Sequence, residues 1–147
     1  MKTIALRFGE HFSPECGTIS AHQQIIDELG YVWYGKMGTP VALHIIEKLK
    51  EQQNPKILLI NSGKFERYWG YIADISRVSP SRDLIPAYYR ELTDKFKTWF
   101  KITGFELAPR DIMSKCIVAS SRKPLGEVSR HSMSPYFIIE YNESPEE

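Results

Sequence analysis

Aromatic side chains near the ends of expected strands are the residues of this 147-residue chain with the clearest chemical meaning. Aromatic residues make up 12% of the sequence. Several of them stand where a strand is expected to meet a loop: Tyr31, Trp33, Tyr34, Tyr68, Trp69, Tyr88, Tyr89 and Trp99. A ring exposed at such a place can stack on a nucleobase, which is worth roughly 1–3 kcal/mol per base. A buried ring instead fills a hydrophobic core.

Trp33 is the first candidate for stacking. Side chains alternate along a strand, so Tyr31 and Trp33 share one face while Tyr34 points to the other. Trp33 also stands two residues before Gly35, where the missing Cβ lets a ligand approach the backbone closely. Core packing remains the alternative for Trp33.

The other aromatic residues divide by their surroundings. Tyr88 and Tyr89 lie in a proline-flanked loop, where a large ring gains less from burial, so a binding role and a structural role both stay open. Trp69 and Trp99 lie within regular strand patterns, and for these two we favour the core.

A second candidate site is a basic, hydroxyl-rich loop that follows an apolar run. Serine hydroxyls and loop N–H groups beside an Arg/Lys pair suit phosphate oxygens. The residues concerned are Ser120, Ser121, Arg122 and Lys123, with Arg130 and Lys64 as possible extensions of the same patch. The alternative is an ordinary solvated loop.

Other kinds of chemistry lack support in the sequence. Gly30–Met37 matches the phosphate-loop spacing G-x4-G-K, but its intervening residues are bulky and Met37 has no hydroxyl for magnesium. The four histidines and the two cysteines, Cys16 and Cys116, show no metal-binding spacing. No nucleophile with its base is apparent, so we expect no metal and no cofactor.

Composition sets the general class of the protein. Hydrophobic residues are 42% and charged residues 25% of the chain, which is typical of one soluble globular domain. No apolar run approaches the ~20 residues of a membrane span, and no secretory segment is evident, so we expect a cytoplasmic protein without membrane contact. The formal charge of +1 excludes a strongly basic coat. We expect a single domain over residues 1–141 and an acidic tail or linker over 142–147.

Periodicity and turn residues predict the elements that would position these side chains. Strands are expected at residues 3–8, 31–36, 57–60, 68–75, 96–103, 116–119 and 136–139. One helix is expected to begin with a Ser20–Gln23 capping box and to stop at Gly30, and another to run from an N-cap at Thr39 to about Gln52. A loop with one helical turn is expected over 77–94. This order predicts an α+β fold, a small mixed β-barrel of about six strands with two or three helices packed outside.

Five segments together resemble the YTH/EVE group of PUA-like domains, which read modified nucleobases. They are Tyr31-Val32-Trp33-Tyr34; Ile57-Leu58-Leu59-Ile60-Asn61-Ser62-Gly63-Lys64-Phe65; Tyr68-Trp69-Gly70-Tyr71-Ile72-Ala73; Phe96 to Ile102; and Ile117 to Val128. The second and third resemble the family hairpin, the fourth its Phe-x-x-x-Trp strand, and the last its late strand with the basic loop. Each motif is short, and their order carries the resemblance.

The resemblance implies a role for each candidate residue. Trp33 would form the first wall of an aromatic cage with Tyr34 beside it, and Tyr88 or Tyr89 would form the second wall, where the family often has tryptophan. Ser62 and Lys64 would belong to the shared hairpin rather than to the pocket. Phosphates would be held by the remaining candidates: Arg7, Ser120, Ser121, Arg122, Lys123 and Arg130.

The function that follows is nucleic-acid binding without catalysis. The module would hold a modified, methylated base flipped into the cage, with DNA as the favoured target and a modification-dependent restriction system as the setting, where an NTPase or nuclease would be fused or associated. One alternative is an RNA reader. A second is a small hydrolase of modified nucleosides using Lys36, Thr39 and Glu47, and a third is a protein-interaction domain with aromatic hot spots.

Overall fold

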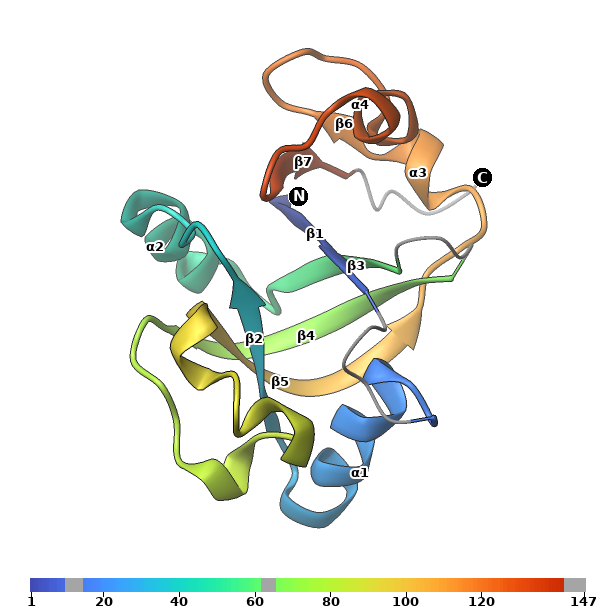
Figure 1. Cartoon of the computed structure of the whole chain (residues 1–147). Coiled ribbons are helices and arrows are strands. Elements are labelled where there is room, and N and C mark those ends of the chain that lie inside the picture. The colour runs from blue at the N-terminus through green and yellow to red at the C-terminus, as the bar shows by residue number, and fades with distance from the viewer. Residues whose placement is uncertain (10–14, 62–65, 142–147) are drawn as a thin grey trace.

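The computed structural model describes residues 1–9, 15–61 and 66–141 of the chain. These residues form a seven-stranded mixed sheet with helices around it (Figure 1). The strands are β1 (Lys2–Phe8), β2 (Val32–Met37), β3 (Lys56–Asn61), β4 (Arg67–Ser76), β5 (Phe96–Leu107), β6 (Ile117–Val118) and β7 (Phe137–Glu140). The helices are α1 (Thr18–Leu29), α2 (Leu43–Glu51), α3 (Ile112–Lys115) and α4 (Leu125–His131). The α+β prediction of a small barrel-like sheet with helices outside is confirmed. No helix within the described ranges is long and apolar enough to cross a membrane.

The sheet is ordered β2-β5-β4-β3-β1-β7-β6. The parallel pair is β1 with β3, and the other neighbours are antiparallel. The β4–β5 ladder contains register shifts, and such irregularities let a strand bend and increase its twist. Figure 1 shows the long β4 and β5 sweeping across the molecule as one strongly curved surface. This curvature brings β2, at one end of the strand order, toward β1.

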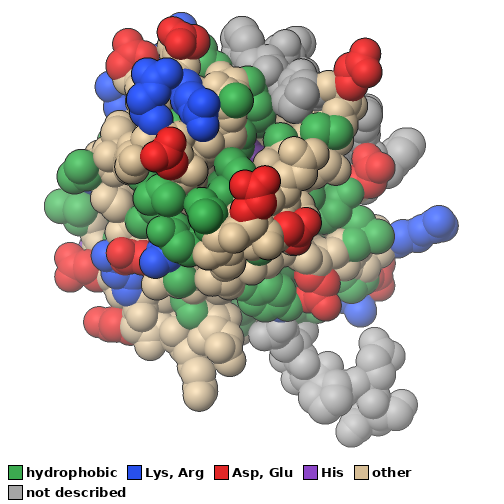
Figure 2. Space-filling model, turned by 90° about the horizontal axis from the view of Figure 1, so that it is seen from below, with side chains coloured by type: hydrophobic (Ala, Val, Ile, Leu, Met, Phe, Trp, Pro, Cys, Tyr) green, Lys and Arg blue, Asp and Glu red, His purple; other side chains and the backbone are tan. Residues whose placement is uncertain are grey.

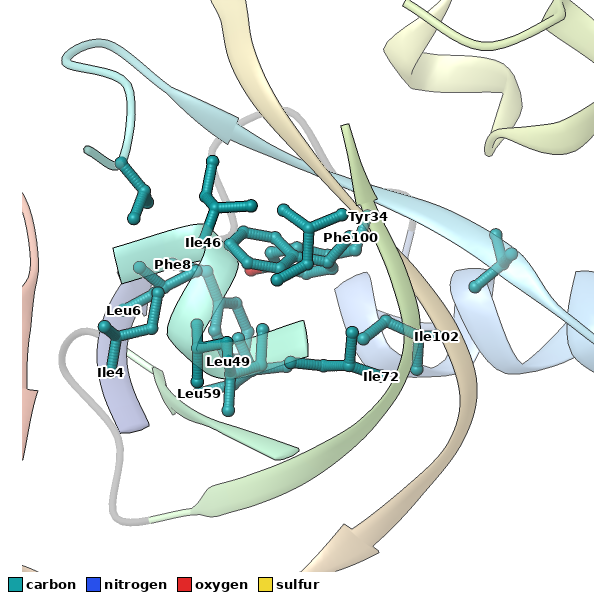
Figure 3. Packing of buried hydrophobic residues seen from close by; sticks show 14 of the residues in the cluster. Ile4, Leu6, Phe8, Tyr34, Ile46, Leu49, Leu59, Ile72, Phe100 and Ile102 are labelled. Carbon is teal, nitrogen blue, oxygen red and sulfur yellow. The ribbon is translucent and has the colours of Figure 1, made fainter. Parts of the chain in front are cut away.

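The inner face of the curved sheet holds the largest hydrophobic cluster. Alternate residues of β1 point into it, together with Tyr34 of β2 and Phe100 of β5 (Figure 3). The β1 residues labelled there are Ile4, Leu6 and Phe8. Helix α1 contributes Ile26 and helix α2 contributes Ile46 and Leu49. The core thus fixes the direction of every second residue of β1 and β2.

The outer face is covered in two places. Around β1, β3 and β7 the cover comes from α3 and α4, through Ile112 and Leu125. Around β2 and β5 it comes from the segment 77–95, which contains three 3₁₀ turns at Arg82–Leu84, Ala87–Tyr89 and Thr93–Lys95. Trp99 is fully buried beneath this segment and Trp69 beneath the first cover, so the assignment of both to the core is confirmed.

The helix starts differ from the sequence expectation. The N-cap of α1 is Gly17 and Ser20 lies inside the helix, so the capping box at Ser20 is wrong; the predicted stop at Gly30 is correct, with Gly30 in the left-handed conformation. The N-cap of α2 is Ala42 rather than Thr39. Neither N-cap makes a side-chain capping hydrogen bond, because glycine and alanine have no side-chain oxygen to accept one.

Three sequence expectations fall outside the described residues. These are the hairpin residues Ser62 and Lys64 and the acidic tail or linker at 142–147.

Candidate functional site

A cavity of about 160 Å³ lies between the free edges of β1 and β2. In the described residues β2 pairs with β5 on one side only, and the β1 residues Leu6–Phe8 pair with β3 while β7 covers only Lys2–Ala5. The cavity occupies the seam that these ladders leave open. Its described lining residues are Leu6, Arg7, Phe8, Gly9, Thr18, Tyr34, Gly35, Lys36, Met37, Tyr88, Tyr89, Leu92, Phe96 and Pro135.

Five aromatic rings form much of this lining, one of them Phe8 of β1. Tyr34 comes from β2, Tyr88 and Tyr89 from the 3₁₀ turn over the sheet, and Phe96 from the start of β5. The ring centroids of Tyr88 and Tyr89 are 4.9 Å apart and those of Tyr89 and Phe96 are 4.4 Å apart. Three of the four residues expected to build a cage therefore meet at one cavity.

Tyr89 is held in place by its hydroxyl as well as by its ring. The side chain is 5% exposed. Burial, with the nearby Tyr34, raises its pKa well above the usual value, against a hydrogen bond with the backbone of Gly35. The hydroxyl therefore stays protonated at neutral pH. Tyr88 is half-buried, and its hydroxyl donates to Thr18 Oγ1 at 3.3 Å, which ties this wall to the start of α1.

His22 of α1 supports the tyrosine walls from behind. It is fully buried, with ring centroids 4.9 Å from Tyr34 and 5.0 Å from Tyr89. Burial lowers the pKa of His22 to about 4, opposed by the hydrogen bond that Nδ1 makes with the Thr18 carbonyl at 2.8 Å. The ring is therefore neutral at pH 7, with its proton on Nδ1 because the carbonyl can only accept. Nε2 has no hydrogen-bond partner among the described residues.

Two cations line the cavity. Arg7 Nη2 donates to the carbonyls of Ser129 and, at 2.8 Å, of Ser132, and its guanidinium lies 5.1 Å from the Phe137 ring centroid. Lys36 is 7% exposed, and its Nζ donates to the carbonyls of Met37, at 3.1 Å, and Thr39. Burial lowers the pKa of Lys36. No acidic side chain occurs among the described lining residues.

Trp33 lies outside this cavity. It is half-buried on the outer face of β2 and packs with the cluster of Ile85, Tyr89, Phe96 and Trp99. Strand alternation explains the difference from Tyr34, which points to the inner core. The space beside Gly35, expected to admit a ligand, is filled: a Cβ there would stand 2.7 Å from Phe96 Cγ. Trp33 thus shares this cluster with Tyr88 and Tyr89 but does not line the cavity where those two residues meet Tyr34.

The expected phosphate residues occupy more than one place. Ser120, Ser121, Arg122 and Lys123 are exposed in a tight turn between β6 and α4, closed by hydrogen bonds from Arg122 N to the Val118 carbonyl and from Val118 N to the Lys123 carbonyl. Arg122 Nη1 pairs with Glu140 Oε2 at 2.9 Å, with both side chains accessible to solvent.

Arg130 and Arg7 lie apart from that turn. Arg130 is exposed on α4 and lines a groove with Arg67 and His131, with its Nε donating to the Gly126 carbonyl at 3.0 Å. Arg7 lies at the cavity. On the face shown in Figure 2, acidic and basic side chains are interspersed with hydrophobic ones, so this face carries no coat of one charge.

Sequence reasoning did not include His22, Phe96 or Leu92 in the site, and it considered Lys36 only for hydrolysis. A helical histidine among apolar residues gave no sign that it would stand behind two tyrosines. Phe96 followed the period of a strand and was assigned to one face of it. Their convergence depends on the curl of the sheet, which no local pattern encodes.

Comparison with known families adds an independent observation. A family model described as Pua-like matches residues 4–139. The chain belongs to the PUA-like family. The match spans every described strand and helix except the first residues of β1 and the last residue of β7. Membership in this family is consistent with binding of nucleic acid or a modified base. No curated protein and no solved structure matches the chain in the corresponding searches.

Proposed function

We propose that this PUA-like chain is a nucleic-acid-binding module that holds a modified base in the cavity between β1 and β2. The observation that carries the proposal is the convergence of Tyr34, Tyr88 and Tyr89 on one cavity of about 160 Å³. A flipped base would lie against these rings, and roughly 1–3 kcal/mol of stacking per base would offset the few kcal/mol that extrusion costs. A methyl group buried there adds about 0.8 kcal/mol.

The favoured setting is DNA recognition for a modification-dependent restriction system. The support is the YTH/EVE resemblance together with the PUA-like match. In that setting the module itself has no catalytic activity, and a fused or associated NTPase or nuclease acts on the DNA. RNA is the alternative target, and the two are separated by titrating matched DNA and RNA oligonucleotides that carry the same base modification.

Phosphate contacts would come from Arg7 at the cavity and from exposed basic side chains outside its lining. Lys123 and Arg130 are exposed, and Arg122 would exchange its pairing with Glu140 for a phosphate. Arg7 is bonded to two backbone carbonyls at the cavity, so it would contact the nucleotide only through its remaining N–H groups. Ser120 and Ser121 would add hydroxyl donors to the same turn.

The experiment that tests the proposal removes one wall of the cavity. Tyr88→Ala is the variant of choice because Tyr88 is half-buried and its loss leaves the main core intact. Tyr31→Ala is the matched control, since Tyr31 is also half-buried but contacts Lys101 instead of the cavity. Fluorescence polarisation would compare labelled oligonucleotides with and without 5-methylcytosine or N6-methyladenine.

The proposal expects Tyr88→Ala to lose roughly 5- to 150-fold in affinity for the preferred modified oligonucleotide, the range that 1–3 kcal/mol of stacking implies. Tyr31→Ala should bind as the unaltered protein does. Equal binding by both variants, with unchanged preference for the modification, would show that the cavity does not bind the modified base.

Hydrolysis of modified nucleosides is a second candidate, favoured by one observation. Lys36 lines the cavity and its pKa is lowered by burial, which makes an amine more available as a base or nucleophile. Its Nζ is bonded to the Thr39 carbonyl, whereas Glu47 is exposed on α2. Incubation of the protein with modified nucleosides, followed by chromatography, decides: turnover that Lys36→Met abolishes would favour the enzyme, and absence of turnover would favour the binding module.

A further inference from the structure

The segment 132–136 joins α4 to β7 at the open side of the cavity. Pro135 lines the cavity, and the Ser132 carbonyl accepts a hydrogen bond from Arg7, which lines it too. Met37 is 40% exposed and Pro135 is also exposed, so the cavity meets solvent where these lining residues lie. A base that enters the cavity from solvent would therefore pass this segment.

Met133 is the most exposed of the large hydrophobic residues that the structure describes, with 93% of its surface accessible to solvent. An isolated exposed apolar residue is common on protein surfaces, so exposure alone assigns no role to it. Its position is more informative, because Met133 lies two residues before Pro135, at the entrance of the cavity. Methionine is unbranched and polarizable, which lets it fill irregular apolar gaps.

The turn that carries Met133 is fixed by its own hydrogen bonds. The hydroxyl oxygens of Ser132 and Ser134 lie 2.8 Å apart, and Ser134 N donates to Ser132 Oγ at 3.2 Å. At the end of the segment the Tyr136 hydroxyl accepts from Ala42 N at 3.3 Å. Because the chain is held on both sides of Met133, this side chain can enter a ligand with little further loss of backbone entropy.

The chain around Met133 carries positive charge. Arg130 and His131 precede it at the end of α4, and both are exposed. No Asp or Glu occurs from residue 128 to residue 139, a stretch that the structure describes in full. A polyanion can therefore approach this turn without repulsion from it, and Arg130 is available to contact a phosphate near the entrance.

Extrusion of a base from a duplex leaves a gap in the stack, and the unpairing and unstacking cost free energy. Proteins that deform duplex DNA insert apolar side chains, methionine among them, between base steps. A single strand has no opposite base and no enclosed gap to fill. An exposed methionine beside a base-binding cavity therefore suits a double-stranded ligand.

We propose that the ligand is double-stranded DNA and that Met133 is a wedge, which enters the base stack at the place that the flipped base has left. The proposal is carried by the exposure of Met133, its fixed turn and its position at the entrance of the cavity. This inference rests on the proposed function and names the substrate class of the same site.

The test compares single-stranded with duplex DNA of one sequence. Fluorescence polarisation would measure affinity for a labelled oligonucleotide that carries 5-methylcytosine or N6-methyladenine, alone, paired with its complement, or paired with a strand that mismatches the modified base. A mismatched base costs less to extrude. Met133→Ala removes the wedge, and Leu107→Ala is the matched control because Leu107 is 64% exposed and outside the cavity lining. Thermal unfolding of both variants would verify that they fold.

Met133→Ala should weaken binding to the matched duplex about tenfold, because the unstacked step loses its apolar contact. Its binding to the single strand should be unchanged, and its loss on the mismatched duplex should be smaller. Leu107→Ala should bind all three ligands as the unaltered protein does.

Three results would overturn the wedge while the reader function stands. They are an unchanged affinity of Met133→Ala for the matched duplex, an equal loss on single strand and duplex, and binding of the unaltered protein to the single strand alone. Absence of binding to every modified oligonucleotide would overturn the proposed function itself.

Discussion

Gly35 shapes the candidate site by letting aromatic side chains pack against its backbone, whereas the sequence predicted that it would let a ligand approach. It lies in β2 facing Trp99 across the ladder, and the rings of Phe96 and Trp99 rest where its side chain would be. This packing lets the Tyr89–Phe96 pair close one side of the cavity. Glycine is needed here for the aromatic cover rather than for the approach of a ligand.

A substitution at Gly35 should therefore destabilise the fold. In Gly35→Ala the new methyl group would meet Phe96 Cγ and Cδ1 at 2.7 and 2.8 Å, so the ring must shift. Overpacking of this kind costs about 1–3 kcal/mol of unfolding free energy. Chemical denaturation measures it, with Gly104→Ala as the control, since no atom lies within 4 Å of a Cβ built on Gly104. Equal stability of the two variants would contradict the packing.

His22 gives the protein a pH-dependent stability. Its pKa is about 4 in the folded protein and near 6.5 when unfolded, so the unfolded chain takes up a proton first as pH falls. The stability that neutral His22 provides is fully present above pH 6.5 and is lost between pH 6.5 and 4, by about 3 kcal/mol.

The unfolding free energy would be measured from pH 7.5 to 4 for the unaltered protein, for His22→Phe and for His44→Phe. His44→Phe is the control, because His44 is exposed. His22→Phe should show the weaker dependence on pH, and His44→Phe should follow the unaltered protein. Parallel curves for all three proteins would show that His22 does not remain neutral.

For single residues, the sequence predicted which side chains belong to the candidate site better than it predicted which of them lie together. Tyr34, Tyr88 and Tyr89 were candidates from composition and position, and they do line one cavity. Trp33 was the leading candidate and lies elsewhere, because alternation separates neighbouring side chains but does not say which face borders a cavity.

Among the elements, β1 is connected to the C-terminal end of α4 by the side chain of Arg7. Arg7 leaves β1 and its Nη2 binds the carbonyls of Ser129 and Ser132, at and just after the end of α4. Carbonyl groups at a helix C-terminus lack intrahelical partners, and a cation there also meets the favourable end of the helix dipole. Arg7 therefore holds α4 against the open end of the β1 edge.

Replacing the Arg7 guanidinium should make local opening of α4 more frequent. Arg7→Lys keeps the charge but cannot span two carbonyls with the same planar geometry. We expect amide hydrogen exchange in Leu125–His131 to become about tenfold faster or more, consistent with the loss of about 1.5–3 kcal/mol for a charge-assisted hydrogen bond. Arg130→Lys should leave exchange near the starting rate, because the Arg130 side chain donates to Gly126 within α4 itself. Unchanged amide hydrogen exchange in Arg7→Lys would show that Arg7 does not hold α4 in place.

The sequence predicted most strands and the end of α1 but misplaced both helix starts. Long alternating or apolar runs such as Ile57–Ile60 carry their own signal, and Gly30 supplies the left-handed residue that ends a helix. Helices α3 and α4 were missed because each is short and its burial depends on the outer face of a sheet made by distant strands.

For the whole molecule, charge predicts how binding responds to salt. The salt dependence of binding reports how many phosphates the protein's Lys and Arg side chains neutralise, so it tests the proposed phosphate contacts. Arg122→Ala should weaken binding to modified and unmodified oligonucleotides alike and reduce the slope of log K against log salt by about one. Lys48→Ala, a matched loss of one charge on α2, should leave the slope unchanged. A loss confined to the modified oligonucleotide would place Arg122 at the base instead.

The most direct test of the central claim is to locate the base in the bound protein. Intermolecular NOEs from the methyl group of a bound 5-methylcytosine or N6-methyladenine oligonucleotide would report the side chains within about 5 Å. The account predicts NOEs to the rings of Tyr34, Tyr88 and Tyr89 and to the methyl groups of Leu6 or Leu92. NOEs to Trp33, or to α2, without any to these tyrosines would contradict it.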